Sequence, residues 1–258
     1  MTAAVFFDDS AARRNAGVLA VAQALYGAVT TALVVTAGLV GSQLASDPSL
    51  ATLPMSMMII GTATTTFPIS LIMKRVGRRA GFVACALGGV LGGLLGAYAI
   101  FEKSFPLFLA GAFLIGVYQA SASYYRFAAA DLASVAFRPK AISWVMTGGI
   151  AAALFGTLMV MGTVDLLAPV TFAGTWLAMA ALSLAGAAIL MAVDIPYKEE
   201  IGKATGRPLA EIARQPRYIV AALTGMLSYG IMVLVMTATP VAMLGCGFSV
   251  QDSSWVIQ

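Results

Sequence analysis

The sequence predicts an all-α membrane protein that crosses the bilayer seven times and begins an eighth helix. Of its 258 residues, 60% are apolar and only 10% are charged, whereas a soluble domain has roughly 45–50% apolar and about 25% charged residues. The mean hydropathy of +0.92 excludes a disordered chain, which needs low hydropathy and high net charge. Because one crossing takes about 20 apolar residues, a chain of this length holds about seven or eight crossings.

Apolar runs of membrane length, separated by polar residues, glycine or proline, locate the predicted helices. They lie at 17–44, 50–73, 80–101, 105–130, 141–163, 167–193 and 217–245. The first run has the full length of a crossing, which argues against a cleaved signal peptide. The final residues, SSWVIQ, return to apolar sequence. We expect an eighth helix to begin there and the chain to be a fragment of a longer protein.

Basic residues mark one side of the membrane. Of the 15 lysines and arginines, all except Lys103 lie in the N-terminal segment, in alternate loops or at the helix ends beside them. Lysine and arginine collect in loops that stay in the cytoplasm, so we expect a cytoplasmic N-terminus. The net charge of +4 does not indicate a nucleic-acid partner, because the basic residues form short clusters between apolar runs and not one solvated face.

The chain has no histidine and two cysteines. A metal site or a Ser-His-Asp hydrolase is therefore not expected, and no pair of carboxylates or thiols within the predicted helices offers acid-base chemistry. We expect neither an enzyme nor a bound cofactor. Cys85 and Cys246 fall at opposite ends of their helices, so they cannot form a disulfide, whose Cα atoms lie within about 7 Å. A retinal photoreceptor is excluded because 217–245 contains no lysine.

Two predicted helices carry small residues at the spacing used for close helix packing. Helix 80–101 has glycines in two rows four residues apart, and helix 141–163 has a similar row. Such residues let two backbones approach closely in lipid. We expect packing contacts at Gly88, Gly89, Gly92, Gly93, Gly96, Gly148, Gly149, Ala152 and Gly156.

The longest predicted loop, 194–216, is charged and separates six helices from the seventh. Within it, Leu209, Ile212 and Ala213 would share one face of a short helix lying on the inner leaflet. A solvated linker is the alternative.

The loop after the second predicted helix carries a motif. Residues 70–79 read SLIMKRVGRR, which resembles the sequence G-x-x-x-D-R-x-G-R-R of the major facilitator superfamily of secondary transporters. Ser70 and Lys74 replace the glycine and the aspartate of that motif. The matching residues are Arg75, Gly77, Arg78 and Arg79.

This resemblance implies a transporter of twelve helices in two halves. The N-terminal six-helix half would be 1–193, the central cytoplasmic loop 194–216, and the beginning of the C-terminal half 217–258. It also implies a multi-pass, monomeric protein of the bacterial inner membrane, in contact with the lipid bilayer.

In the family, the loop after helix two takes part in a cytoplasmic latch between the halves. Asp131 resembles the acidic partner of that latch. Arg126 either belongs to the gate or extends to the lipid headgroups. The predicted latch residues are therefore Arg75, Gly77, Arg78, Arg79, Arg126 and Asp131.

Helices one, four and seven line the central cavity in this family. Polar and aromatic residues near their midpoints predict a substrate site at Gln23, Tyr26, Thr30, Tyr118, Gln119, Ser123 and Tyr229. The alternative is that these side chains only join helices to each other. No charged residue lies near the middle of any predicted helix, which favours a neutral or aromatic solute held by hydrogen bonds and ring stacking.

The resemblance implies transport of a small organic solute by alternating access. The motif R-x-x-x-G, associated with proton coupling, aligns with Ala112 and Gly116, so its arginine is absent. Thr157 stands where many antiporters place proline after the glycine of helix five. A proton-coupled efflux antiporter of drugs or metabolites, with its coupling carboxylate outside this sequence, is one alternative. A non-transporting membrane scaffold is another.

Overall fold

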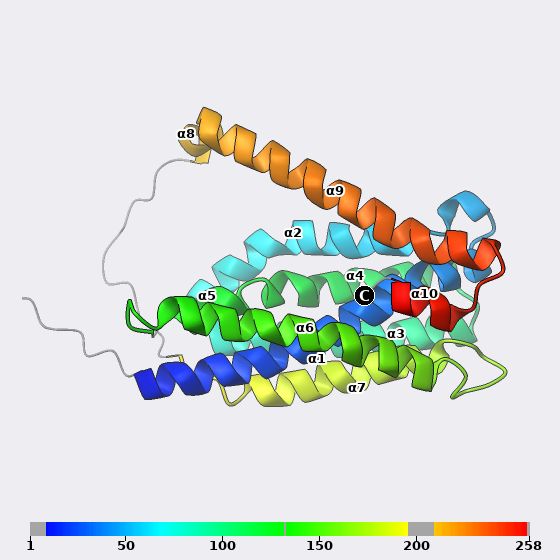
Figure 1. Cartoon of the computed structure of the whole chain (residues 1–258), viewed down its shortest axis with the longest axis horizontal. Helices are drawn as coiled ribbons and strands as arrows, with labels where there is room; N and C mark the ends of the chain where they lie inside the picture. The colour runs from blue at the N-terminus through cyan, green and yellow to red at the C-terminus, as the bar shows by residue number, and fades with distance from the viewer. Residues whose placement is uncertain (1–8, 132, 196–208, 257–258) are drawn as a thin grey trace, which may run out of the picture.

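The computed structural model describes residues 9–131, 133–195 and 209–256, and every regular element in these ranges is a helix. Seven segments are long and apolar enough to cross a membrane, as the sequence predicts. The helices are α1 (Asp9–Leu44), α2 (Leu53–Val76), α3 (Arg78–Phe101), α4 (Phe105–Ala122), α5 (Tyr125–Ala130), α6 (Arg138–Thr163), α7 (Ala173–Leu190), α8 (Leu209–Ala213), α9 (Pro216–Gly245) and α10 (Val250–Val256), with a 3₁₀ turn at Pro48–Leu50. Figure 1 shows the long helices side by side.

Three helix boundaries differ from the prediction. Helix α1 begins at Asp9, because hydropathy locates the membrane and not the polar turns that continue the helix outside it. Predicted helix 105–130 is interrupted between α4 and α5, where the Tyr124 N–H bonds the Ser121 carbonyl 3.0 Å away in a tighter turn. Helix α7 begins at Ala173, six residues late, because Phe172 adopts φ 71° and its N–H bonds back to Val164.

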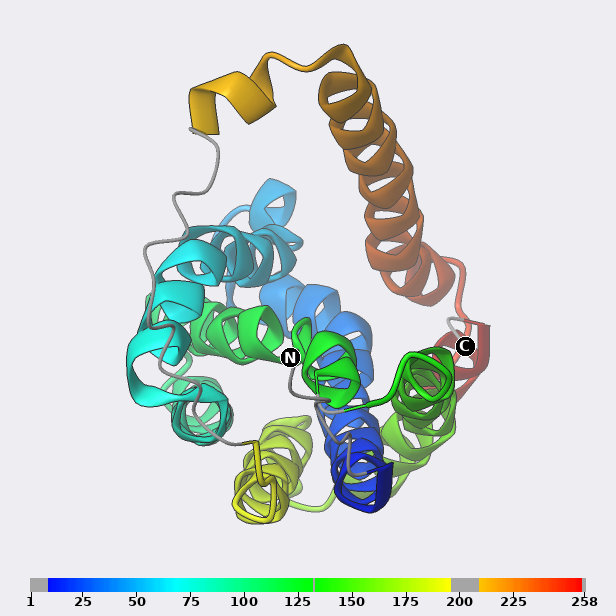
Figure 2. The same cartoon turned by 90° about the vertical axis from the view of Figure 1, so that its left-hand side faces the viewer.

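Helix α1 lies at the centre of the bundle. It packs against α6 on one side and against α7 on the other, while α3 packs between α7 and α4, and α2 covers α4. The bundle is therefore open between α2 and α6, and α9 stands across this opening (Figure 2). Helix α9 approaches α1 where a Cβ on Gly38 would lie 2.9 Å from the Val241 side chain.

Four of the five predicted glycines of α3 pack closely, and only Gly88 does not, because the nearest atom to its Cβ position is a Val117 methyl carbon 3.9 Å away. A Cβ on Gly92 would lie 2.9 Å from the Gly111 carbonyl oxygen of α4, and a Cβ on Gly93 would lie 2.7 Å from the Ala180 nitrogen of α7. In α6, Gly148 meets the Ala20 backbone of α1. Gly149 does not fit the prediction, because nothing lies within 4 Å of its Cβ position.

Both cysteines are free, with Cys85 buried and Cys246 exposed, as expected from their helix positions. Residues 209–213, in the predicted loop, form the short helix α8. One end of the bundle combines the starts of α1, α3, α6 and α9 with the ends of α2, α5 and α7. We call it the basic end, because every described lysine and arginine except Lys103 belongs to these helix ends or the loops beside them.

Candidate substrate site and gate

At the basic end, two predicted latch residues meet. The Arg78 Nη2 lies 2.8 Å from the Asp131 Oδ2, and the two side chains are 34% and 37% exposed. Gly77 makes this geometry possible: with φ 90° it ends α2 and starts α3 in one residue, a conformation that a side chain disfavours. The pair therefore joins the turn between α2 and α3 to the segment after α5.

The other predicted latch residues do not enter this ion pair. Arg75 and Arg79 are exposed on either side of the turn. Arg126 is exposed on α5, and its guanidinium carbon lies 5.0 Å from the centre of the Phe127 ring. This position agrees with the interfacial alternative for Arg126.

Sequence reasoning missed the contacts that tie α1 to this end. The Asp9 carboxylate accepts hydrogen bonds from the N–H and the hydroxyl of Ser134, both at 3.1 Å. Asn15 is buried and pairs both ways with the Asp194 backbone, donating to its carbonyl at 2.7 Å and accepting from its N–H at 3.1 Å. Polar residues in the first turns of a membrane helix are the only signal that could have indicated them.

Of the predicted substrate residues, the two inner tyrosines lie in the core. Tyr26 and Tyr118 are 8% and 0% exposed, and their rings meet edge to face at 5.1 Å. The Tyr118 ring also packs against Gly89, and its hydroxyl against Gly186. In this structure Tyr118 joins α4 to α3 and α7 and does not reach an open face.

The other predicted substrate residues are more accessible. Gln23, Thr30 and Gln119 are partly buried, and Ser123 is exposed. Tyr229 is 47% exposed on α9.

Helix α2 adds polar contacts that were not predicted. The Thr62 hydroxyl lies 3.3 Å from the Gln119 Oε1 and 3.1 Å from the Gly116 carbonyl oxygen. One helical turn further, the Tyr124 hydroxyl donates to the Thr66 carbonyl at 3.2 Å. The threonine-rich stretch 62–66 is unusual within an apolar helix and is the signal that could have indicated this contact.

The resulting site is polar but uncharged. Helix α4 contains no charged residue, and those of α1 and α2 lie near the basic end. Within the residues that the structure describes, no cluster of histidine, cysteine, aspartate or glutamate could hold a metal ion. Hydroxyl and amide groups on α1, α2 and α4 can therefore hold an uncharged solute through hydrogen bonds.

Seven apolar spans, a basic end and an uncharged polar interior define a multi-pass helical membrane protein. The chain belongs to the Major Facilitator Superfamily, whose family model matches residues 19–257. This is a family of transporters, and membership agrees with the expectation that the chain is not an enzyme.

Two bacterial relatives are similar to the chain. It is 41% identical over 254 residues to the riboflavin transporter RfnT of Brucella anthropi, covering 97% of this chain and 64% of that protein. It is 27% identical over 246 residues to the uncharacterized MFS-type transporter YdeG of Bacillus subtilis, covering 90% of this chain and 57% of that protein. The chain thus spans less than two thirds of either relative. No solved structure gave a significant match.

Proposed function

We propose that this protein carries riboflavin, or a closely similar neutral heteroaromatic solute, across the bacterial inner membrane by alternating access. The observation that carries the proposal is the 41% identity with a riboflavin transporter over nearly the whole chain. The uncharged polar site supports it independently, because a neutral solute needs no opposite charge in the membrane interior.

The chemistry of riboflavin suits the side chains around Gln119. Its ring system presents carbonyl oxygens and an imide N–H, and its sugar-alcohol chain presents hydroxyls. A glutamine amide has both donors and an acceptor, and Thr62 lies 3.3 Å from its oxygen. Gln23 and Thr30 on α1 are assigned to the hydroxyls, and Tyr229 on α9 to stacking with the ring.

The proposed orientation places the basic end in the cytoplasm, following the distribution of lysine and arginine. Residues 1–193 then form the N-terminal half, 194–216 the central loop, and 217–258 the beginning of the second half. The Arg78–Asp131 pair acts as a cytoplasmic gate that holds while the site opens outward and breaks when it opens inward.

Uptake of labelled riboflavin tests this function. The full-length protein is expressed in bacteria that cannot synthesise riboflavin. Uptake of labelled riboflavin is then compared with that of cells carrying an empty vector. We expect saturable uptake that unlabelled riboflavin inhibits and flavin mononucleotide, with its charged phosphate, inhibits weakly. Uptake no greater than that of the empty vector would refute the proposal. Inhibition by flavin mononucleotide as strong as that by riboflavin would refute a substrate site that selects neutral solutes.

A further inference from the structure

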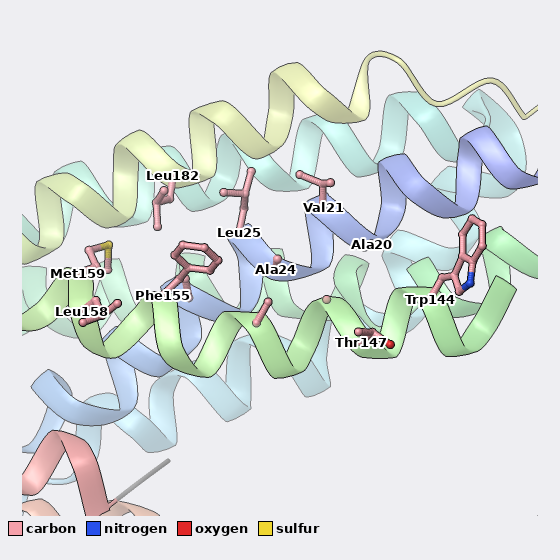
Figure 3. Close-up of a pocket in the computed structure, with 13 residues that line it drawn as sticks. Ala20, Val21, Ala24, Leu25, Trp144, Thr147, Phe155, Leu158, Met159 and Leu182 are labelled. Atoms are coloured by element: carbon pink, nitrogen blue, oxygen red, sulfur yellow. The ribbon is translucent and has the colours of Figure 1, made fainter. Parts of the chain in front are cut away.

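An apolar groove of ≈ 810 Å³ runs along the outer side of α1, between α6 and α7. Figure 3 shows Val21 and Leu25 of α1, Trp144 and Phe155 of α6, and Leu182 of α7 along it. Small residues let α1 and α6 approach each other, since Gly148 meets the Ala20 backbone. The larger side chains then stand out beside this close contact and leave a concave, apolar channel.

The groove is separate from the proposed substrate site. Val21 lines the groove, and Gln23, two residues later, points about 160° away around the helix. The substrate residues of α1 therefore face the interior of the bundle, and the groove faces the surrounding hydrocarbon. Val21 and Phe155 are 50% and 64% exposed, so the groove is open along its length in the described part of the chain.

Two basic residues lie over the basic end of this groove. Arg13 precedes the groove residue Ala20 by two helical turns, and Lys140 precedes the groove residue Trp144 by one turn, so each lies on the same side of its helix as the groove. The rings of Phe137 and Trp144 meet at 5.6 Å, and the Arg13 guanidinium carbon lies 5.5 Å from the Phe137 ring centre.

Neither cation is neutralised within the described part of the chain. Arg13 and Lys140 are exposed, and neither takes part in the ion pairs Arg14–Asp194 and Arg78–Asp131 at the same end. The apolar groove thus ends at two positive charges beside an aromatic pair.

We propose that this groove binds one anionic glycerophospholipid from the leaflet at the basic end. An acyl chain lies against α1 and α6, and the phosphate lies between Arg13 and Lys140. The α6 lining extends from Trp144 to Met159, about 22 Å at the helical rise per residue, which exceeds half of the ~30 Å hydrocarbon core. Basic sites at the cytoplasmic ends of membrane helices attract anionic headgroups, whereas the ammonium of a zwitterionic lipid would be repelled by the same two cations.

Trp144 provides a direct readout, because bromine atoms on an acyl chain quench a tryptophan that they contact. The chain carrying Trp255→Phe is reconstituted in phosphatidylcholine vesicles, and dibrominated phosphatidylglycerol or dibrominated phosphatidylcholine is added in increasing fractions. A second sample carrying Trp144→Phe as well gives the emission of Trp176, which is fully buried, for subtraction. We expect phosphatidylglycerol to reach half-maximal quenching at a mole fraction about tenfold lower.

Three variants decide the assignment. Arg13→Gln with Lys140→Gln is expected to abolish the preference for phosphatidylglycerol, and Ala151→Leu, which fills the groove, to weaken quenching by both lipids. Arg217→Gln removes a charge at the same end on α9 and is expected to retain the preference. Equal quenching by the two lipids in the parent chain, or a preference that survives the double substitution, would overturn the proposal. These readouts need no transport, so they are independent of the substrate.

Discussion

The Arg78 Nη2 lies 2.8 Å from the Asp131 Oδ2, and this contact connects the turn between α2 and α3 with the end of α5. Both side chains are about one third exposed, and ion pairs with such access to water contribute about 1 kcal/mol or less. The pair is thus too weak to hold the bundle together but well suited to break and re-form. Such a property is what a gate requires.

Neutralising Asp131 is therefore expected to change access to the site more than it changes stability. With Asp131→Asn, a cysteine introduced at Thr30, a partly buried predicted substrate residue of α1, should react several-fold faster with a maleimide supplied at the basic end. The measurement is the labelling rate in membrane vesicles, in a background carrying Cys246→Ser.

Two comparisons make the gate experiment decisive. Arg78→Gln should also increase labelling, and the double variant should fall short of the sum of the two single changes, because both single changes break the Arg78–Asp131 ion pair. Asp165→Asn neutralises an exposed carboxylate at the other end of α6 and should leave labelling unchanged. A labelling rate and uptake that stay at parent values in Asp131→Asn would refute the gate.

Adjacent glycines in α6 give a test of packing with its own control. Gly148→Ala places a methyl group against the Ala20 backbone of α1, which cannot move aside as a flexible side chain would. We expect a loss of about 1–3 kcal/mol, typical of overpacking. Gly149→Ala has nothing within 4 Å and should be neutral or stabilising by up to about 1 kcal/mol, because alanine favours helix.

Thermal unfolding in detergent, followed by size-exclusion of the surviving protein, measures both glycine variants. The predicted order of midpoints is Gly149→Ala at or above the parent and Gly148→Ala clearly below it. If the two variants had the same midpoint, α1 and α6 would not pack as the structure describes.

Hydropathy predicts the spans of this protein well because each crossing requires a long apolar run, whatever its neighbours are. It does not predict the break at Ser123 and Tyr124, since neither proline nor glycine marks it. It also cannot separate a core aromatic from a site aromatic: Tyr118 is fully buried, although its position in the middle of the predicted helix 105–130 fits either role. The Thr62–Gln119 contact was missed because it joins segments 57 residues apart, which no local periodicity encodes.

Asn15 and Arg14 are neighbours in α1 and both contact Asp194, but replacing Asn15 should lower the free energy of unfolding much more than replacing Arg14. Asn15 is 1% exposed and makes two hydrogen bonds to the Asp194 backbone. Asn15→Ala removes the buried amide and both of its part-buried hydrogen bonds to the Asp194 backbone, which costs about 1–3 kcal/mol.

Arg14 is the matched control for Asn15. Its ion pair with the Asp194 carboxylate has side chains that are 58% and 73% exposed, so Arg14→Gln should cost less than about 1 kcal/mol. The same detergent melt compares the two variants. A larger loss for Arg14→Gln than for Asn15→Ala would show that charge, and not the buried amide, fixes the end of α7 to α1.

The α2 threonines allow the proposed substrate site to be tested without changing side-chain volume. Thr62→Val removes the hydroxyl 3.3 Å from the Gln119 Oε1 and frees that amide to rotate, so riboflavin affinity should fall about tenfold, equivalent to about 1.4 kcal/mol for one lost positioning contact. Gln119→Ala should weaken riboflavin binding at least as much.

Thr64→Val is the control. The Thr64 hydroxyl bonds carbonyl groups of its own helix, and Thr64 lies about 160° away from Thr62 around α2. Quenching of riboflavin fluorescence on binding gives the dissociation constant of each variant. Equal affinities for Thr62→Val and Thr64→Val, with Gln119→Ala at the parent value, would remove the face between α2 and α4 from the substrate site.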